Sequence, residues 1–245
     1  MLHFFKTKPY LKDIIPSNYV DIHSHLLPGI DDGAKTMEDT KSLIASLQNI
    51  GFEQFITTPH IMVPIWDNTP ESITQKLKET LPVLQQENHS LKMKAAAEYL
   101  MDVSFSENIQ SQPLATLKDN YVLVEMSYLN APIQLYQIIF DLQIAGYIPV
   151  LAHPERYSFY NRNFAEYQKL KNAGCLFQLN LLSTVGYYGA SVTKTAAQLV
   201  KEGMIDFVGS DVHHLNHVEA FSKRLLLKDI SPLKEAIEKN QFFRF

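Results

Sequence analysis

An apolar stretch of strand length is followed by a helix-like stretch again and again along this chain of 245 residues. The strands are nearly continuous in apolar residues, which is typical of strands buried on both faces of a parallel sheet. Such units fold either as a barrel or as an open sheet with helices on both faces. The seven predicted strands occupy residues 20–25, 54–58, 91–97, 121–124, 147–152, 175–179 and 205–210.

Local signals predict where the helices begin and end. Thr36, with acidic residues two and three positions later, resembles a helix N-cap, and Thr69 followed by Pro70 predicts another helix start. Ser191 is predicted to cap a later helix, and glycines follow most of the predicted helices. The predicted helices cover residues 36–50, 69–88, 132–145, 164–173 and 191–202 and a stretch from about residue 232.

Most of the predicted strands end in a residue that can bind a metal. His23 and His25 project from the same face of the first strand because side chains alternate with period two. Asp211 and His213 follow the last strand in a similar pair. In a barrel the carboxyl ends of all strands converge on one rim, whereas an open sheet would spread them out. We therefore predict a barrel whose rim carries nine candidate metal ligands, namely His23, His25, Asp32, His60, Glu98, Glu125, His153, Asp211 and His213.

Some of these residues also have purely structural explanations. His60 and His153 each lie beside a proline at the end of an apolar strand and could be buried polar residues of the core. Asp31 and Asp32 could be turn formers before Gly33. The joint pattern favours metal binding, because buried strand ends seldom carry ionisable groups unless these are paired or bound to a metal.

Imidazole and carboxylate ligands without a thiolate suit manganese, iron or zinc. Nine ligands are more than one ion needs, so the sequence indicates two or three divalent ions. A carboxylate such as Glu98 could bridge two of them and hold them about 3.5–4 Å apart, the spacing that suits phosphoryl displacement. Hydrolysis of a phosphate ester is the chemistry that such a site favours.

Composition argues against several other classes of protein. The single cysteine, Cys175, excludes an internal disulfide framework, and Leu181 stands where a cysteine-dependent tyrosine phosphatase needs arginine. A net charge of -4 gives no basic surface for nucleic acid, so we expect no nucleic-acid partner. We find no apolar run long enough to span a bilayer and no signal peptide, and we therefore expect a cytoplasmic protein without membrane insertion.

Residues 1–18 have no clear period and are predicted to be an N-terminal extension without chemistry. Residues 19–245 are predicted to form one domain, since no linker or repeat divides them. A homo-oligomer is left open by the sequence.

The segment Asp21–Lys35 resembles the first motif of the PHP (polymerase and histidinol phosphatase) superfamily. It is most similar to the bacterial manganese-dependent protein-tyrosine phosphatases of capsule and exopolysaccharide operons. The resemblance covers the chain from Tyr19 onward and implies a distorted seven-stranded TIM-like barrel, the PHP fold. It continues in order through Thr57-Thr58-Pro59-His60, Ala97-Glu98-Tyr99, Val124-Glu125-Met126-Ser127, Ala152-His153-Pro154-Glu155-Arg156-Tyr157, Asn172-Ala173-Gly174-Cys175 and Ser210-Asp211-Val212-His213.

The resemblance also implies a role for each candidate ligand. Manganese is the expected metal, with iron or zinc as alternatives, and a metal-activated hydroxide attacks phosphorus. Arg156 would hold the phosphoryl oxygens and stabilise their growing charge. One ion would be bound by His23, His25, Glu98 and Asp211, a second by Glu98, Glu125 and His153, and a third by Asp32, His60 and His213.

The chain departs from the family pattern in two places. Some members carry an arginine shortly after the final Asp-x-His, whereas this chain has His217 there, which could replace that second phosphate clamp. The loop after His60 is apolar and contains Trp66, which could stack on a tyrosine ring or pack onto the barrel rim. Trp66 and His217 are therefore predicted substrate-binding residues beside Arg156.

We expect a phosphatase of phosphotyrosine in protein, acting on the tyrosine-rich tail of a bacterial polysaccharide-assembly kinase. A PHP-type phosphatase of a small monoester such as histidinol phosphate is the alternative that keeps the same chemistry. A barrel amidohydrolase or deoxyribonuclease is another, but seven units and the carboxylate Glu98 argue against amidohydrolases, which typically have eight strands and often a bridging lysine. A phosphotyrosine-binding regulatory protein without turnover is a third.

Overall fold

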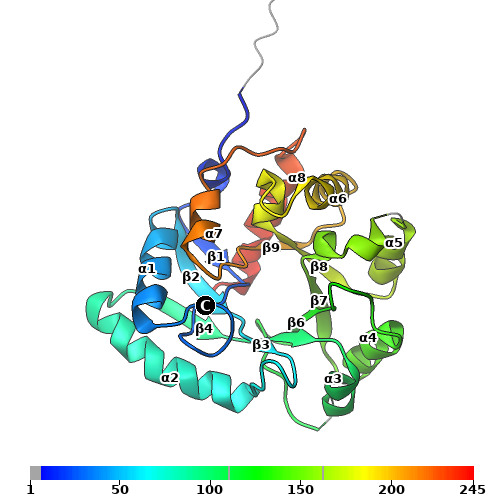
Figure 1. Cartoon of the computed structure of the whole chain (residues 1–245), viewed down its shortest axis with the longest axis horizontal. Coiled ribbons are helices and arrows are strands. Elements are labelled where there is room, and N and C mark those ends of the chain that lie inside the picture. The colour runs from blue at the N-terminus through cyan, green and yellow to red at the C-terminus, as the bar shows by residue number, and fades with distance from the viewer. Residues whose placement is uncertain (1–6, 110, 162) are drawn as a thin grey trace, which may run out of the picture.

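Short parallel strands in two sheets form the centre of the molecule, and helices surround them (Figure 1). The computed structural model describes residues 7–109, 111–161 and 163–245. One sheet has the order β1-β2-β4 and the other β3-β5-β6-β7-β8-β9, and all paired strands are parallel. The strands are β1 (Tyr19–Asp21), β2 (Phe52–Thr57), β3 (His60–Ile61), β4 (Lys92–Ala95), β5 (Glu98–Leu100), β6 (Tyr121–Glu125), β7 (Ile148–Ala152), β8 (Leu176–Asn180) and β9 (Phe207–Gly209).

The helices confirm most of the predicted boundaries. Thr36 and Thr69 each accept a hydrogen bond from the backbone N–H three residues later, and both take part in capping boxes. Ser191 was the wrong cap, because the helix already begins at Ala190 and the Ser191 hydroxyl instead accepts from Asn161. The helices are α1 (Met37–Gln48), α2 (Pro70–Glu87), α3 (Val103–Asn108), α4 (Leu135–Ile144), α5 (Ala165–Asn172), α6 (Ala190–Lys201), α7 (Leu215–Ala220) and α8 (Ser231–Lys239).

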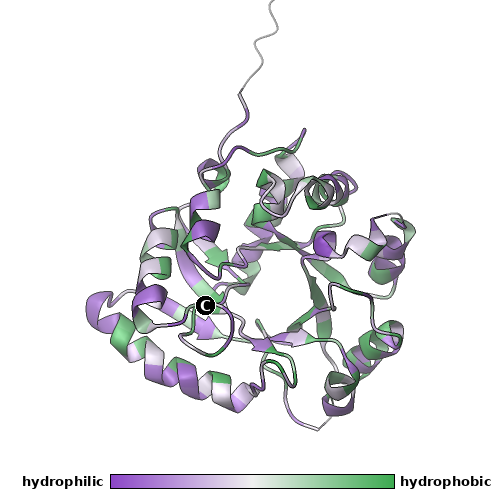
Figure 2. Ribbon diagram, in the orientation of Figure 1, coloured by the Kyte–Doolittle hydropathy of each residue, from purple (hydrophilic) through white to green (hydrophobic). Residues whose placement is uncertain are grey.

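Figure 2 shows the central strands β7 and β8 largely in green, whereas the outer helices α2 and α5 carry long purple stretches. The strands are buried on both faces, as their continuous apolar sequence predicts. In the described part of the chain, no helix is both long and apolar enough to cross a membrane. The predicted α/β class with parallel strands is confirmed.

Two of the predicted strands are each followed by a short strand that the sequence pattern does not predict. The second predicted strand, residues 54–58, becomes β2, and β3 follows after Thr58 and Pro59. The third predicted strand, residues 91–97, becomes β4, and β5 begins at Glu98. Pro59 has no N–H to donate to a strand ladder, which accounts for the first break. His60 and Glu98 therefore begin strands instead of ending them, and they face each other in register.

Backbone contacts join the start of the chain to its last strand. The N–H of Asp211 donates to the carbonyl of His23 at 2.7 Å, and the N–H of His25 donates to the carbonyl of Val212 at 3.0 Å. Ser24 and Val212 form an isolated parallel bridge between these two bonds. The two histidines of the first motif are thereby fixed beside Asp211, although almost 190 residues separate them in sequence.

The segment before β1 packs along the surface of the domain. Leu11 is buried, and the N–H groups of Leu11 and Lys12 donate to the carbonyls of Lys223 and Phe221. The first six residues of the predicted extension lie outside the described residues.

Candidate metal centre

The structure brings all nine candidate ligands together in one cluster, with Glu125 at the carboxyl end of β6 and His60 and Glu98 at the starts of β3 and β5. They form overlapping groups whose ligand atoms lie within 4.8 Å of one another. Above them is an open cavity of about 370 Å³ that is lined by seven of the nine, with His23 and His25 buried beneath it. The groups are His25, Asp32, His60 and His213; His23, Glu98 and His153; His23, His25 and Asp211; and His60, Glu98 and Glu125.

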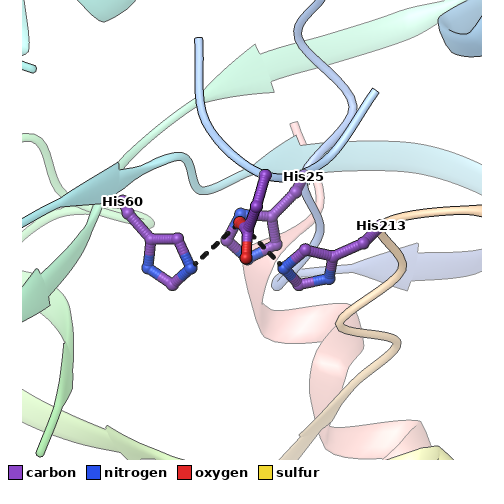
Figure 3. A group of neighbouring side chains, drawn as sticks. His25, His60 and His213 are labelled. Atoms are coloured by element: carbon purple, nitrogen blue, oxygen red, sulfur yellow. Dashed lines mark ion pairs between the residues drawn. The ribbon is translucent and has the colours of Figure 1, made fainter. Parts of the chain in front are cut away.

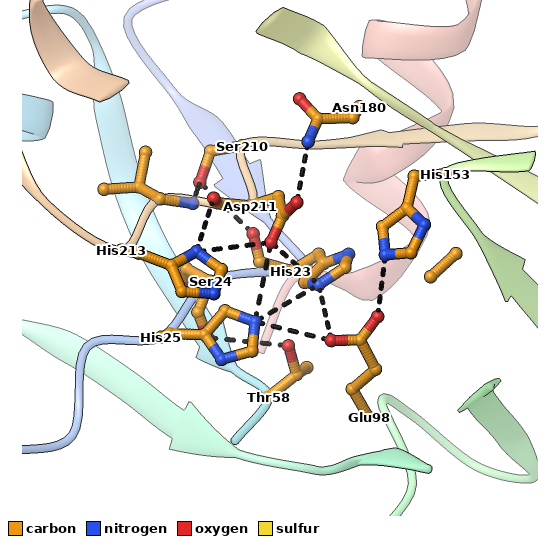
Figure 4. Close-up of polar contacts among 12 residues, drawn as sticks. His23, Ser24, His25, Thr58, Glu98, His153, Asn180, Ser210, Asp211 and His213 are labelled. Atoms are coloured by element: carbon orange, nitrogen blue, oxygen red, sulfur yellow. Dashed lines mark hydrogen bonds and ion pairs between the residues drawn. The ribbon is translucent and has the colours of Figure 1, made fainter. Parts of the chain in front are cut away.

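The deepest ligand atoms come from His23, His25, Glu98 and Asp211, which are drawn in Figure 4. Nε2 of His23 lies 3.1 Å from Glu98 Oε2, 3.4 Å from Asp211 Oδ1 and 3.4 Å from Nε2 of His25. Nε2 of His25 lies 3.4 Å from the same Glu98 oxygen and 3.5 Å from the same Asp211 oxygen. Ligands placed tetrahedrally about 2.1 Å from one ion stand about 3.4 Å apart, and the five spacings given above are close to that value.

Glu98 turns its two oxygens toward different imidazoles. Oε1 lies 3.0 Å from Nε2 of His153, whereas Oε2 lies 3.1 Å from His23 and 3.3 Å from Nδ1 of His60. This is the arrangement that a bridging carboxylate requires.

His60 and Glu125 provide a test of whether a metal fits here. Nδ1 of His60 and Oε1 of Glu125 are 2.9 Å apart. Both atoms are buried, yet neither has a hydrogen-bond partner of acceptable geometry among the described residues. Two buried polar atoms left without such a partner are costly, and a shared cation would satisfy both.

Figure 3 shows the rings of His25, His60 and His213 around one carboxylate. That carboxylate is Asp32, whose Oδ1 lies 3.4 Å from His213 and 3.5 Å from His60. Asp31 instead points its Oδ2 at Nδ1 of His25, 2.7 Å away. The two neighbouring aspartates therefore have different surroundings, and only Asp32 belongs to a candidate ligand group.

Sequence reasoning missed the residues that orient these ligands. Nδ1 of His23 is 2.7 Å from Oε1 of Gln178, and Nδ1 of His25 is held by Asp31. Asn180 donates from Nδ2 to Asp211 at 2.7 Å. Such partners fix the orientation of a metal-binding ring so that its other nitrogen faces the ion. The available signal was Gln178, a polar residue within an otherwise apolar predicted strand, and Asn180 directly after that strand.

Charges in the cluster stabilise one another. Burial opposes the charged form of His23, but Glu98 and Asp211 outweigh it and raise the pKa of His23 to about 9. Burial also opposes the charged forms of Glu98 and Asp211. The charge of His23, with that of His60 beside Glu98 and of Arg156 beside Asp211, nevertheless holds the pKa of both carboxyls well below the usual range. The carboxylates are therefore ionised at neutral pH, as metal ligands must be.

Two of the candidate ligands have unusual backbone conformations. His153 has φ 35° and Asp211 has φ 50°, in the left-handed region that residues with a Cβ seldom adopt. Conformations of this kind cost about 1–3 kcal/mol each and cluster at functional sites. The surrounding fold imposes them and directs both side chains into the cluster.

Arg156 projects into the same cavity between two tyrosines. Its guanidinium carbon lies 4.7 Å from the ring centre of Tyr128 and 4.2 Å from that of Tyr188. Nη1 donates to Oδ2 of Asp211 at 2.8 Å. The neighbouring Glu155 faces away and accepts from the hydroxyl of Ser183 at 2.6 Å. Stacked cations of this type are held in a fixed orientation.

The other two predicted substrate-binding residues also line this cavity. Trp66 is half-buried in a loop closed by backbone hydrogen bonds between Met62 and Trp66. His217 is buried, and its Nδ1 accepts from the backbone N–H of His213. Burial and the neighbouring His214 lower the pKa of His217 to about 4, so this ring is neutral at pH 7 and lacks the charge of the arginine found in some relatives.

Metal binding to this cluster is expected to strengthen as the pH rises. His23 with a pKa of about 9 carries a proton at pH 7 that an ion must displace. Affinity should therefore rise by about tenfold per pH unit for each displaced proton and level off above about pH 9. In the metal-free protein, the same raised pKa stabilises the fold below the ordinary value of 6.5, and this stabilisation is lost as pH rises through about 9.

Calorimetric titration with Mn²⁺ in buffers of different ionisation enthalpy would count the released protons. An affinity that is independent of pH would contradict the expectation.

A family model described as "Capsular polysaccharide synthesis, CpsB/CapC" matches residues 19–220 of the chain. The chain belongs to this family. The match covers the metal cluster and Arg156 and confirms the resemblance that the sequence motifs indicate.

Two curated relatives are named tyrosine-protein phosphatases. YwqE of Bacillus subtilis is 29% identical over 197 residues, which are 80% of this chain and 78% of YwqE. CpsB of Streptococcus pneumoniae is 26% identical over 203 residues, which are 80% of this chain and 84% of CpsB.

Solved structures agree with these matches. A structure reported for YwqE and CpsB as "unique metal-dependent tyrosine phosphatases" superposes with a TM-score of 0.76 at 28% identity, covering 82% of this chain and 84% of the other. A histidinol phosphate phosphatase from Lactococcus lactis gives a TM-score of 0.50 at 13% identity and covers 91% of this chain and 94% of the other. At that identity the second likeness concerns the fold alone.

Proposed function

We propose that this chain is a metal-dependent protein-tyrosine phosphatase. The observation that carries the proposal is the placement of Arg156 beside Asp211, at the mouth of a cavity whose floor is the cluster of imidazoles and carboxylates. Membership of the CpsB/CapC family and the similarity to YwqE and CpsB support phosphotyrosine over a small phosphate monoester or another barrel metallohydrolase.

Two or three ions, with Mn²⁺ as the native metal, are proposed for the cluster. His23, His25 and Asp211 form one candidate group and would hold the deepest ion together with Glu98, whose Oε2 lies near both histidines. The remaining ligands would hold the others, with Glu98 shared, and the overlap of the candidate groups supports this assignment. When bound, the ions supply a nucleophile at neutral pH and neutralise charge on the phosphate oxygens.

The residues of the chain would then act as follows. Arg156 binds two phosphoryl oxygens through its planar fork and stabilises the charge that grows on them. Tyr128 and Tyr188 hold the guanidinium in place, and the aromatic rim with Trp66 contacts the phenyl ring of the substrate. Gln178 and Asp31 keep the rings of the deepest histidines oriented.

Several broader assignments are part of the proposal. The hydrogen bonds between the first motif and the last strand support a distorted seven-unit barrel that is closed at this point. Residues 19–245 would form the catalytic domain and residues 1–18 an extension. The proposed substrate is the phosphorylated tail of a bacterial polysaccharide-assembly tyrosine kinase, and the cytoplasmic location and the oligomeric state stay predictions.

The test is hydrolysis of a phosphotyrosine peptide by the purified chain. We expect inorganic phosphate to be released, a chelator to abolish the release, and added Mn²⁺ to restore it. A phosphoserine peptide and histidinol phosphate serve as comparison substrates. Turnover of histidinol phosphate without turnover of phosphotyrosine would reject the substrate assignment, and phosphate release that survives complete metal removal would reject the mechanism.

Because Tyr188 stacks on Arg156, we expect two substitutions of Tyr188 to have different effects on activity. Tyr188→Leu removes the ring and is expected to lower kcat/KM by about tenfold, since stacking of a desolvated cation contributes about 1–2 kcal/mol. Tyr188→Phe keeps the ring and loses only the hydroxyl that accepts from Asn180, so it should retain most of the activity. Steady-state kinetics of both variants would check this, and equal losses in the two would show that stacking is not the cause.

A further inference from the structure

A second cavity lies on the other side of the loop that holds Tyr128. Its volume is about 330 Å³, and its walls come from β5, α3, α4 and the segment between β6 and α4. The apolar residues that line it are Leu100, Met101, Val103, Pro132, Ile133 and Ile138.

The mostly apolar lining of this cavity favours an apolar ligand group. Asp102 is the one charged residue among the described residues that line it, and its Oδ1 already accepts from the backbone N–H of Phe105 as the cap of α3. Ile133 is 101% exposed and Val103 is 63% exposed. Large apolar side chains that are exposed beside a cavity indicate a surface where another apolar group is bound.

The position of the cavity indicates what binds there. Ser127 lines the apolar cavity, whereas the next residue, Tyr128, lines the metal cavity and stacks on Arg156. On the neighbouring strand, Leu100 lines the apolar cavity and pairs in register with the candidate ligand Glu125. One loop therefore separates the two cavities. The Cα atoms of consecutive residues are about 3.8 Å apart, so the walls formed by Ser127 and Tyr128 are close together.

A polypeptide bound by its phosphotyrosine can reach across this loop. An extended chain advances about 3.3 Å per residue, so a side chain a few positions from the phosphotyrosine arrives over the apolar cavity. Leu129, the next residue after Tyr128, is 86% exposed and would contact the crossing segment.

We infer that the cavity at Leu100, Val103 and Ile133 is a substrate subsite, which binds an uncharged apolar side chain close to the phosphotyrosine in the same polypeptide. This inference rests on the proposed function and adds a sequence preference to it. Affinity for the protein substrate thus depends on two neighbouring cavities, one for the phosphate and one for an apolar residue.

A set of phosphotyrosine peptides tests the subsite in the metal-loaded protein. Each peptide has serine at all flanking positions except one, where leucine is placed, and the leucine is moved through the positions in turn. We expect leucine at one position, or two adjacent positions, to raise kcat/KM by about tenfold over the all-serine peptide. Ile133→Asp is expected to reduce this ratio to about one, because a carboxylate then faces the incoming apolar group.

Ile144→Asp is the matched control. Ile144 lies at the other end of α4, is 65% exposed and does not line the cavity. This variant should keep the preference for leucine and the hydrolysis of a small aryl phosphate. Its behaviour separates the loss of the subsite from a general effect of placing a charge on α4.

Three outcomes would overturn the inference. If the metal-loaded protein hydrolyses no phosphotyrosine peptide, the proposed function fails and the subsite fails with it. If all peptides are hydrolysed equally, the function stands and the subsite alone is wrong. If Ile133→Asp changes the molecular mass measured by light scattering from dimer to monomer and leaves the leucine preference intact, the cavity binds a second copy of the chain instead.

Discussion

Replacing Glu98 by glutamine is expected to lower kcat for phosphotyrosine hydrolysis by about a thousandfold or more. The amide has the same shape but removes the negative charge that lies within 3.3 Å of His23, His60 and His153. A loss of about 4 kcal/mol in transition-state stabilisation corresponds to three decades of rate. The metal content measured by atomic spectrometry should fall with the activity, because a neutral amide cannot bridge two ions as a carboxylate does.

Glu202→Gln provides the control for this substitution. Glu202 follows α6 at the surface, and its contact is with the adjacent Lys201. This variant should keep both its metal and its rate. A Glu98→Gln protein with full metal content and unchanged kcat would refute the shared carboxylate, and a circular dichroism spectrum like that of the parent would show that the fold is intact.

Arg156→Lys is expected to lower kcat/KM by about a hundredfold to a thousandfold, the effect of losing one well-placed donor to a developing oxyanion. Lysine keeps the positive charge, but it has neither the planar fork for two phosphoryl oxygens nor a flat face to stack between Tyr128 and Tyr188. The metal content should not change, because a guanidinium has no acceptor atom to offer a metal ion.

Arg224→Lys is a matched control for stacking far from the cavity. The guanidinium carbon of Arg224 lies 4.4 Å from the ring centre of Tyr10, so this substitution removes a similar contact at the surface. Its kinetics should equal those of the parent chain. Equal activity of Arg156→Lys and the parent would exclude the fork as the phosphate clamp.

The ligand cluster could be predicted because strand ends are visible in sequence. Most apolar stretches of this chain end close to a histidine or an acid, and parallel strands bring those ends to one place. Asp32 is among the nine candidate ligands predicted from the sequence, and the family resemblance implies its place beside His60 and His213. In the structure, the backbone turn sends Asp31 toward His25 and Asp32 toward His60 and His213, a difference that two adjacent aspartates do not reveal in sequence.

Two aspects of the structure could not be predicted from local pattern. The short strands β3 and β5 depend on how two sheets meet, and Pro59 alone does not specify that. The stacking of Tyr188 on Arg156 joins residues from separate loops, and neither residue carries a periodic signal. Tertiary packing determines both, whereas hydrophobic periodicity reports only on single elements.

The pairing of Ser24 with Val212 also affects how the protein matures during synthesis. The segments that carry His23 and Asp211 must both be present before these residues can meet, and contacts between residues far apart in sequence slow folding. A nascent chain on the ribosome therefore lacks the complete candidate metal site until the segment with Asp211 and His213 has emerged. We expect metal to bind the whole cluster only after that segment has been made.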